Sequence, residues 1–190
     1  MQRSAFFRLL FPLLIYFGSR FVFNQATETA NNPAPYNPPP SNPAVTNVAQ
    51  VPAATVQNLP TEQIEQLIHE KINDYRISQG LPALSLDYRI TNESRKYSEK
   101  MASGEAEFSH DGFDERAENL EKQALKYESV GENLAMLQGY DDLATEAVNG
   151  WIASPGHHKN IVGDYELTGI GVVKNEAGEY YFTQLFLKRL

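Results

Sequence analysis

A proline- and asparagine-rich segment at residues 27–58 limits which part of this chain can fold. The segment is rich in Pro, Asn, Ala and Thr, and it contains three consecutive prolines at 38–40. Such a composition buries too little apolar surface to offset the entropy that is lost when a chain is ordered. Proline also favours the polyproline II conformation, so we expect a disordered, semi-rigid linker here. A folded domain is therefore expected at residues 59–190.

The first 26 residues have the pattern of an export signal. Residues 1–8 hold two arginines and no acidic residue, and the apolar run Leu9–Phe17 follows. This run is shorter than the ~20 apolar residues that span a bilayer, and a basic start before a short apolar run is typical of a secretory signal. If Phe21–Phe23 prolongs the apolar segment, it would remain as an anchor. We therefore expect a signal peptide or N-terminal anchor at 1–26, and a location outside the cell or in its envelope. Any membrane contact would run through this segment alone.

Charge and cysteine content exclude several classes of function. The formal net charge is −8; residues 1–57 contribute +2, so residues 58–190 carry −10. Proteins that bind nucleic acid replace its counterions with Lys and Arg, so we expect no nucleic-acid partner. The chain has no cysteine, which excludes disulfides, thiolate metal ligands and cysteine nucleophiles. Stability must then come from a hydrophobic core, which a domain of ~130 residues can supply.

The spacing of apolar residues predicts helices first and a hairpin of strands last. The predicted helices run from a cap at Thr61 to Gly80, from a cap at Asp87 to Gly104, over 114–126, from Asp141 or Asp142 to a break at 154–156, and over one turn at 157–161. Residues 81–84 are predicted to form a turn. The predicted strands are 129–136, 167–173 and 180–187, with a hairpin turn at 175–178. This order predicts the α+β class, with helices packed over a sheet.

Polar side chains that could share a site gather between residues 131 and 161, and a further candidate, His110, lies upstream of this stretch. Because cysteine is absent, a metal ion would need His, Asp or Glu ligands, and the candidate set is His110, Glu132 and His157. Two imidazoles and a carboxylate with one open position would suit zinc, with Glu132 as the candidate catalytic residue.

Other interpretations of the same residues stay open. His110 and Glu132 lie on different predicted elements, and their side chains could instead hydrogen-bond each other and join a loop to the sheet. Ser154 and His157 do not predict a nucleophile and its base, because no Gly-x-Ser-x-Gly elbow is present. Ser154 is better explained as part of a turn that ends a helix.

Six motifs occur in a fixed order along residues 62–188. They are Phe108-Ser109-His110, Gly131-Glu132-Asn133-Leu134, the helix end at 148–151, the segment Ser154-Pro155-Gly156-His157 with Asn160-Ile161, Gly169-Ile170-Gly171-Val172, and residues 181–186. Together they resemble the CAP superfamily of cysteine-rich secretory, antigen 5 and pathogenesis-related proteins, also called the SCP domain. The closest likeness is to its cysteine-free, exported bacterial branch. The resemblance implies a three-layer α-β-α sandwich with a small antiparallel sheet over residues 59–190.

The resemblance also implies a cleft that in many members carries two His and two Glu and sometimes binds zinc. His110 matches the first histidine of this pattern, and Glu132 matches the glutamate of the Gly-Glu-Asn motif. Ser154 stands where the second glutamate would be, and Tyr181 stands where the second histidine would be. The bacterial branch offers His157 instead. The set carried over is therefore His110, Glu132 and His157.

The function expected from these observations is that of a binding or interaction module with a His/Glu cleft. The polar set lacks a complete catalytic constellation, which favours binding over catalysis. Two alternatives are a zinc-dependent hydrolase that acts on peptide or cell-wall material, and a lipid-binding protein. The expected ligand is a peptide, a wall polymer or a lipid, since the fold alone does not select an activity.

Overall fold

The computed structural model describes residues 19–21 and 59–190. The predicted signal or anchor at 1–26, apart from Ser19–Phe21, and the predicted linker at 27–58 lie outside the described residues. In the part of the chain that is described, no helix is both long and apolar enough to cross a membrane.

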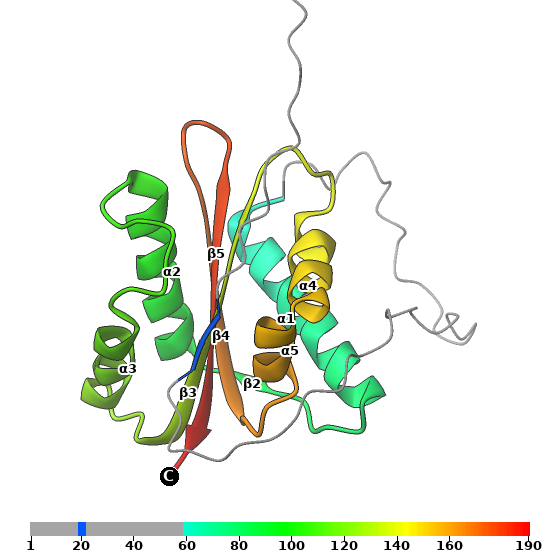
Figure 1. The fold of residues 1–190 in the computed structure, drawn as a ribbon, viewed down its shortest axis with the longest axis vertical. Helices are drawn as coiled ribbons and strands as arrows, with labels where there is room; N and C mark the ends of the chain where they lie inside the picture. The colour runs from blue at the N-terminus through cyan, green and yellow to red at the C-terminus, as the bar shows by residue number, and fades with distance from the viewer. Residues whose placement is uncertain (1–18, 22–58) are drawn as a thin grey trace, which may run out of the picture.

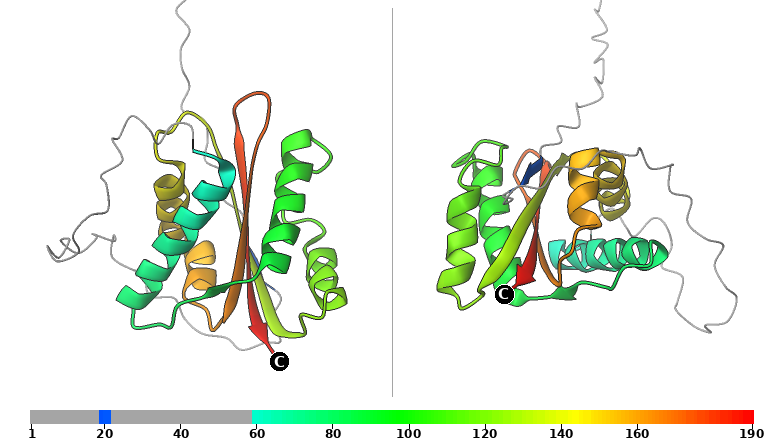
Figure 2. Two further views of the ribbon diagram at one scale, coloured as in Figure 1. Left: turned by 180° about the vertical axis from the view of Figure 1, so that it is seen from behind. Right: turned by 60° about the horizontal axis from the view of Figure 1, so that its bottom comes forward.

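A five-stranded sheet separates two layers of helices (Figures 1 and 2). The strand order is β1-β3-β5-β4-β2, with β1 Ser19–Phe21, β2 Ser85–Leu86, β3 Tyr127–Leu137, β4 Leu167–Lys174 and β5 Tyr180–Arg189. One layer holds α2 (Tyr88–Ser103) and α3 (Phe113–Lys122), and the other holds α1 (Thr61–Ser78), α4 (Leu143–Ala153) and α5 (Pro155–Ile161). The predicted α+β class and the three-layer α-β-α sandwich are confirmed.

Three local predictions need correction. The sheet is not wholly antiparallel, because β2, which was not predicted, pairs parallel with β4. The third helix ends at Lys122 instead of residue 126, since Ala124 adopts a positive φ of 63° that breaks the helix and turns the chain into β3. Thr61 is the first residue of α1, and its N-cap is Pro60, which offers no side-chain hydrogen bond.

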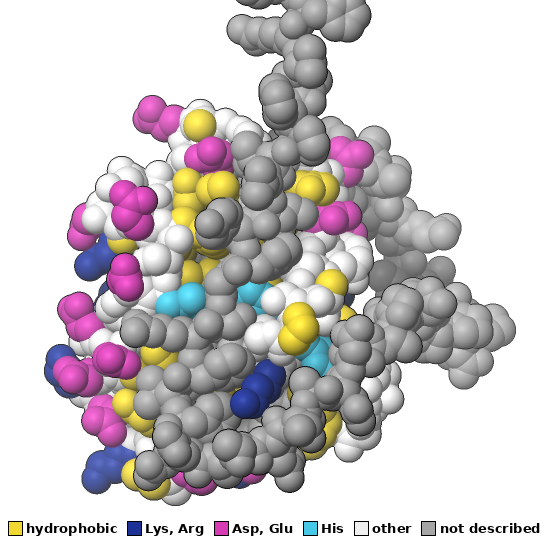
Figure 3. Space-filling view, viewed as in Figure 1, with side chains coloured by type: hydrophobic (Ala, Val, Ile, Leu, Met, Phe, Trp, Pro, Cys, Tyr) yellow, Lys and Arg dark blue, Asp and Glu magenta, His cyan; other side chains and the backbone are white. Residues whose placement is uncertain are grey.

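The hydrophobic core fills both sides of the sheet. The larger cluster lies between the sheet and α1, α4 and α5, and it includes the wholly buried Trp151, Ile68 and Phe182. Two smaller clusters lie on the side of α2 and α3, around Leu120 and Leu134. The outer side of α3 is acidic, as predicted, and acidic side chains are spread over this side of the molecule (Figure 3).

Two glycines of β4 allow α2 to lie directly on the sheet. A Cβ atom on Gly171 would be 2.2 Å from the backbone nitrogen of Arg95, so no side chain fits between this strand and the helix. The hydroxyls of Ser94 and Ser98 donate to the carbonyls of Gly169 and Gly171 at 3.1 and 2.9 Å. This contact fixes the height of α2 over the sheet, and with it the position of the side chains that α2 presents to the candidate site.

A buried arginine fixes the opposite layer. Arg76 of α1 is only 1% exposed, and its guanidinium donates to the carbonyls of Pro82, Ile161 and Gly163 at 2.9, 2.7 and 2.9 Å. Burial lowers the pKa of this guanidinium, and the nearby carboxylate of Asp164 opposes that shift. Because two of the three carbonyls lie at the end of α5 or just after it, Arg76 ties α5 to α1.

Candidate functional site

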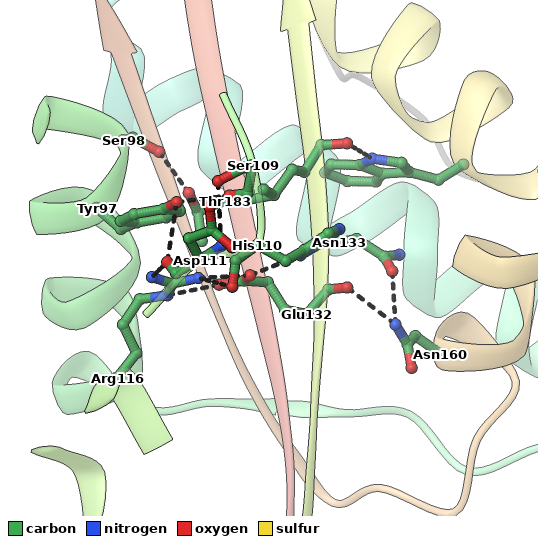
Figure 4. A network of polar contacts seen from close by, with 12 residues as sticks. Tyr97, Ser98, Ser109, His110, Asp111, Arg116, Glu132, Asn133, Asn160 and Thr183 are labelled. Atoms are coloured by element: carbon green, nitrogen blue, oxygen red, sulfur yellow. Dashed lines mark hydrogen bonds and ion pairs between the residues drawn. The ribbon is translucent and has the colours of Figure 1, made fainter. Parts of the chain in front are cut away.

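The site is organised by two consecutive residues of β3. Successive side chains of a strand point to opposite faces of the sheet. Glu132 points toward the layer of α2 and α3, whereas Asn133 points toward the layer of α4 and α5 (Figure 4). Both side chains are wholly buried. The Gly-Glu-Asn motif therefore serves both helical layers at once.

The carboxylate of Glu132 is held by an arginine and a histidine. Arg116 of α3 donates from Nε to Oε2 and from Nη2 to Oε1, both at 2.7 Å, which is a bidentate ion pair. Nδ1 of His110 lies 2.7 Å from the same Oε1. An ionised carboxylate can only accept hydrogen bonds, so Nδ1 is the protonated ring nitrogen and its N–H donates a hydrogen bond to Oε1 of Glu132. The loop and α3 are joined to the sheet through this one side chain.

Arg116 is itself enclosed. Its guanidinium carbon lies 3.4 Å from the centre of the Tyr97 ring, and Nη1 donates to the carbonyl of Asp111 at 2.9 Å. The hydroxyl of Tyr97 donates to the carbonyl of Ser109, so α2 supports both the arginine and the loop that carries His110 (Figure 4). Burial raises the pKa of Tyr97, which keeps this hydroxyl protonated as a donor.

One nitrogen of the network remains available. When Nδ1 of His110 is protonated and the ring is neutral, Nε2 carries a lone pair and is an acceptor. Nε2 is buried and has no hydrogen-bond partner among the described residues. A side chain whose orientation is fixed by a carboxylate, with its second nitrogen unpaired, is suited to bind a proton donor.

The opposite side of β3 carries an amide network. Asn160 of α5 donates from Nδ2 to the carbonyl of Glu132 at 3.0 Å and to Oδ1 of Asn133 at 2.8 Å. Nδ2 of Asn133 in turn donates to the carbonyl of His157 at 3.2 Å. Nearby, the indole of Trp151 donates to the carbonyl of Leu134 at 3.0 Å. Side chains of α4 and α5 thus bond two carbonyls at the outer edge of β3.

With this geometry established, comparison with known proteins identifies the family. The model of CAP, the cysteine-rich secretory protein family, matches residues 69–186, which is more than half of the chain. The chain belongs to the CAP family. The cysteines for which the family is named are absent here. The matched range includes all of the predicted site residues.

Two proteins of Bacillus subtilis (strain 168) are similar in sequence to this CAP-family chain. The uncharacterized membrane protein YlbC is 32% identical over 128 residues, which cover 66% of this chain and 34% of YlbC. The uncharacterized protein YkwD is 28% identical over 172 residues, which cover 86% of this chain and 64% of YkwD. The chain thus spans about a third and under two thirds of the lengths of these relatives.

Solved structures share the CAP fold. An extracellular protein with an SCP domain from Bacillus anthracis is 25% identical, with a TM-score of 0.57 over 68% of this chain and 41% of that one. An outer surface protein from Borrelia burgdorferi is 20% identical, with a TM-score of 0.58 over 70% of this chain and 97% of that one. The second likeness shows the fold alone.

The structure brings two of the three predicted CAP site residues together. His110 and Glu132 are hydrogen-bonded, which confirms the alternative in which they join a loop to the sheet. His157 is wholly buried on α5, which lies across β3 from α3 (Figure 1). Within 19–21 and 59–190, no three His, Asp or Glu side chains gather as a metal site would require. Both oxygens of Glu132 are bonded to Arg116, so this set does not fit a zinc ion as it stands, and zinc binding stays a prediction.

Arg116 is the site residue that was not predicted from the sequence. It lies three residues after Phe113 and four before Leu120, both of which are buried inward-facing residues of α3. A basic residue at helical spacing with an apolar stripe faces the core, where it needs an acidic partner. That spacing was a usable signal. The exposed acidic residues of the same helix instead indicated a solvated outer face.

Proposed function

We propose that this chain is an exported binding module, acting outside the cell or in its envelope, with a His/Glu site at His110 and Glu132; His157, the third residue expected there, lies across β3 on α5. Membership of the CAP family supports this proposal, as do the descriptions of similar bacterial proteins as extracellular or outer-surface proteins. The observation that carries it is the bidentate pairing of Glu132 with Arg116.

This pairing favours recognition over catalysis. A general base or metal ligand needs a lone pair that can reach a substrate or an ion. The carboxylate of Glu132 is 0% exposed, and it accepts two bonds from Arg116 and one from His110. One polar atom left to meet a ligand is Nε2 of His110, which accepts a hydrogen bond when the ring is neutral.

The proposal is tested with three defined probes: a cell-wall fragment made of a disaccharide that carries its stem peptide, an extended peptide, and phosphatidylglycerol vesicles. Binding is measured by calorimetry, and turnover is measured with and without zinc. We expect at least one probe to bind saturably without being hydrolysed, and to bind at least tenfold more weakly to His110→Ala. The control is His69→Ala, which removes a half-buried histidine of α1 that contacts the carbonyl of Leu84. This control should bind like the unmodified chain.

A zinc-dependent hydrolase is the second candidate. It is favoured by one observation, because a histidine oriented by a carboxylate with its other nitrogen unpaired is typical of a metal ligand. It requires Glu132 to exchange Arg116 for the metal. Stoichiometric zinc binding that is weakened by both His110→Ala and His157→Ala, together with zinc-dependent turnover lost in a folded Glu132→Gln variant, would replace the binding module with this candidate.

A further inference from the structure

The outer edge of β3 has an extended segment paired to it at the centre of the site. Ser19–Phe21 forms β1 and runs antiparallel to β3, with Ser19 opposite Asn133, Arg20 opposite Glu132 and Phe21 opposite Gly131. Figure 1 shows β1 in blue along β3, between the two helical layers. The contact of this segment with the domain that the structure describes is its pairing with the strand edge.

The edge of β3 is also where buried polar atoms lack partners among the described residues. Nε2 of His110 lies on the side of α2 and α3, and Oδ1 of Asn160 lies on the side of α4 and α5. Both side chains bond Glu132, one at the carboxylate and the other at the backbone carbonyl. The amide of Asn160 cannot be reversed to remove its orphan oxygen, because its nitrogen donates to two acceptors. Native proteins leave few such atoms unpaired. Both stay unpaired while Ser19–Phe21 lies along the edge, so they are left for the side chains of a ligand in trans.

The strand edge keeps its capacity to pair. The carbonyls of Glu132 and Leu134 already accept side-chain donors from α5 and α4, which shows that both face outward from β5. A carbonyl oxygen has two lone pairs and can accept a second hydrogen bond. An extended peptide that adds a strand to such an edge gains affinity from its main chain, while pockets beside the edge read its side chains.

We propose that the edge of β3 at Gly131–Asn133 is a docking groove for an extended polypeptide, and that Ser19–Phe21 occupies this groove in cis. The inference rests on the proposed function and names the ligand class of the same cleft. A polypeptide is favoured over a lipid or a sugar because the observed occupant is backbone in strand geometry. A ligand in trans can pair with this edge only if it displaces Ser19–Phe21 or if that segment has been removed from the chain.

The test uses the full chain and its Arg20→Pro variant. Proline at the middle of β1 removes a backbone donor and opposes strand pairing, whereas the matched control Arg20→Ala changes only the side chain. The probe is a synthetic peptide with the sequence of residues 18–23. Binding is followed by NMR at the amides of Glu132 and Asn133 and at the single indole N–H, which belongs to Trp151 and bonds the edge carbonyl of Leu134.

We expect Arg20→Pro to shift the amide signals of Glu132 and Asn133, and Arg20→Ala to leave them in place. Adding the peptide to Arg20→Pro should restore them saturably, with an affinity at least tenfold higher than for the unmodified chain, in which the groove is filled. A peptide with proline at its centre should not bind. Equal amide shifts in Arg20→Pro and Arg20→Ala would overturn the inference. So would equal peptide affinity for Arg20→Pro and the unmodified chain.

Failure of this inference is separable from failure of the binding module. If the peptide does not bind but phosphatidylglycerol vesicles or the cell-wall fragment shift the ring signals of His110, the docking groove is wrong and the binding module stands. If zinc-dependent turnover is found and no probe binds without it, both proposals fall.

Discussion

At the scale of single residues, the site depends on compensation of one buried charge. The side chains of Glu132 and Arg116 are 0% and 7% exposed, so each has lost its hydration and relies on the other. The aromatic ring of Tyr97 covers the guanidinium, and among the described residues its ion pair is with Glu132. Removing either residue alone should therefore destabilise the fold strongly, because it leaves the other charge buried without a partner.

Replacing Arg116 by methionine should be strongly destabilising. The variant Arg116→Met leaves the carboxylate of Glu132 buried without a counterion, and we expect the free energy of unfolding to fall by about 3–5 kcal/mol. Urea denaturation measures this change. The double variant Arg116→Met with Glu132→Gln, which has no buried charge, should recover part of the loss. The contact between Arg116 and Tyr97 is lost in both variants, so its contribution cancels when their free energies of unfolding are compared. Equal losses in the single and double variants would contradict charge compensation.

At the scale of elements, the closeness of α2 and β4 makes a small substitution costly. Gly171→Ala places a Cβ atom 2.2 Å from the backbone of α2, which must then move away from the sheet. We expect the free energy of unfolding to fall by about 1–3 kcal/mol or more, because the obstacle is helix backbone and cannot rotate aside. Displacement of α2 should also move Tyr97, and chemical shifts of His110 and Arg116 would report this.

A second glycine separates contact from backbone strain. Gly104 ends α2 with a positive φ of 77°, and no atom lies within 4 Å of the position that a Cβ would take there. Gly104→Ala should cost only the left-handed strain of about 1–2 kcal/mol and leave the signals of the site unchanged. A shift of the His110 signals in this variant would show that α2 transmits strain along its length, which would argue against a local contact at Gly171.

The elements also show what the sequence could predict. Periodic apolar residues located the helices and both strands of the final hairpin, and Asp87 and Asp142 cap their helices as expected. The end of α3 was missed because Ala124 is a good helix former that nevertheless adopts a positive φ. The strand β2 was missed because two residues carry no periodicity. Contact between His110 and Glu132 was one of two predicted possibilities, and only the fold could choose between them.

At the scale of the whole molecule, residues 59–190 should form an independent folding unit. The core clusters of the described side chains are built from this range, and β1 is a three-residue strand at the edge of the sheet. We expect a chain of residues 59–190 to unfold cooperatively, with a free energy of unfolding within about 1 kcal/mol of the full chain, since core burial dominates stability. Urea denaturation of both chains is the measurement. A broad, non-cooperative transition for residues 59–190 would show that the N-terminal segment is needed for folding.

The neighbouring positions of Glu132 and Asn133 have a consequence for how the chain finds its fold. A slip of β3 by one residue against β5 would exchange the two faces of the strand. It would place an amide beneath Arg116 and an unpaired carboxylate beside Asn160, so the slipped register would be less stable on both sides of the sheet. A long central strand with mostly buried side chains could otherwise pair in more than one alignment. Two adjacent polar residues thus select one register of β3 against β5 during folding, before any ligand is bound.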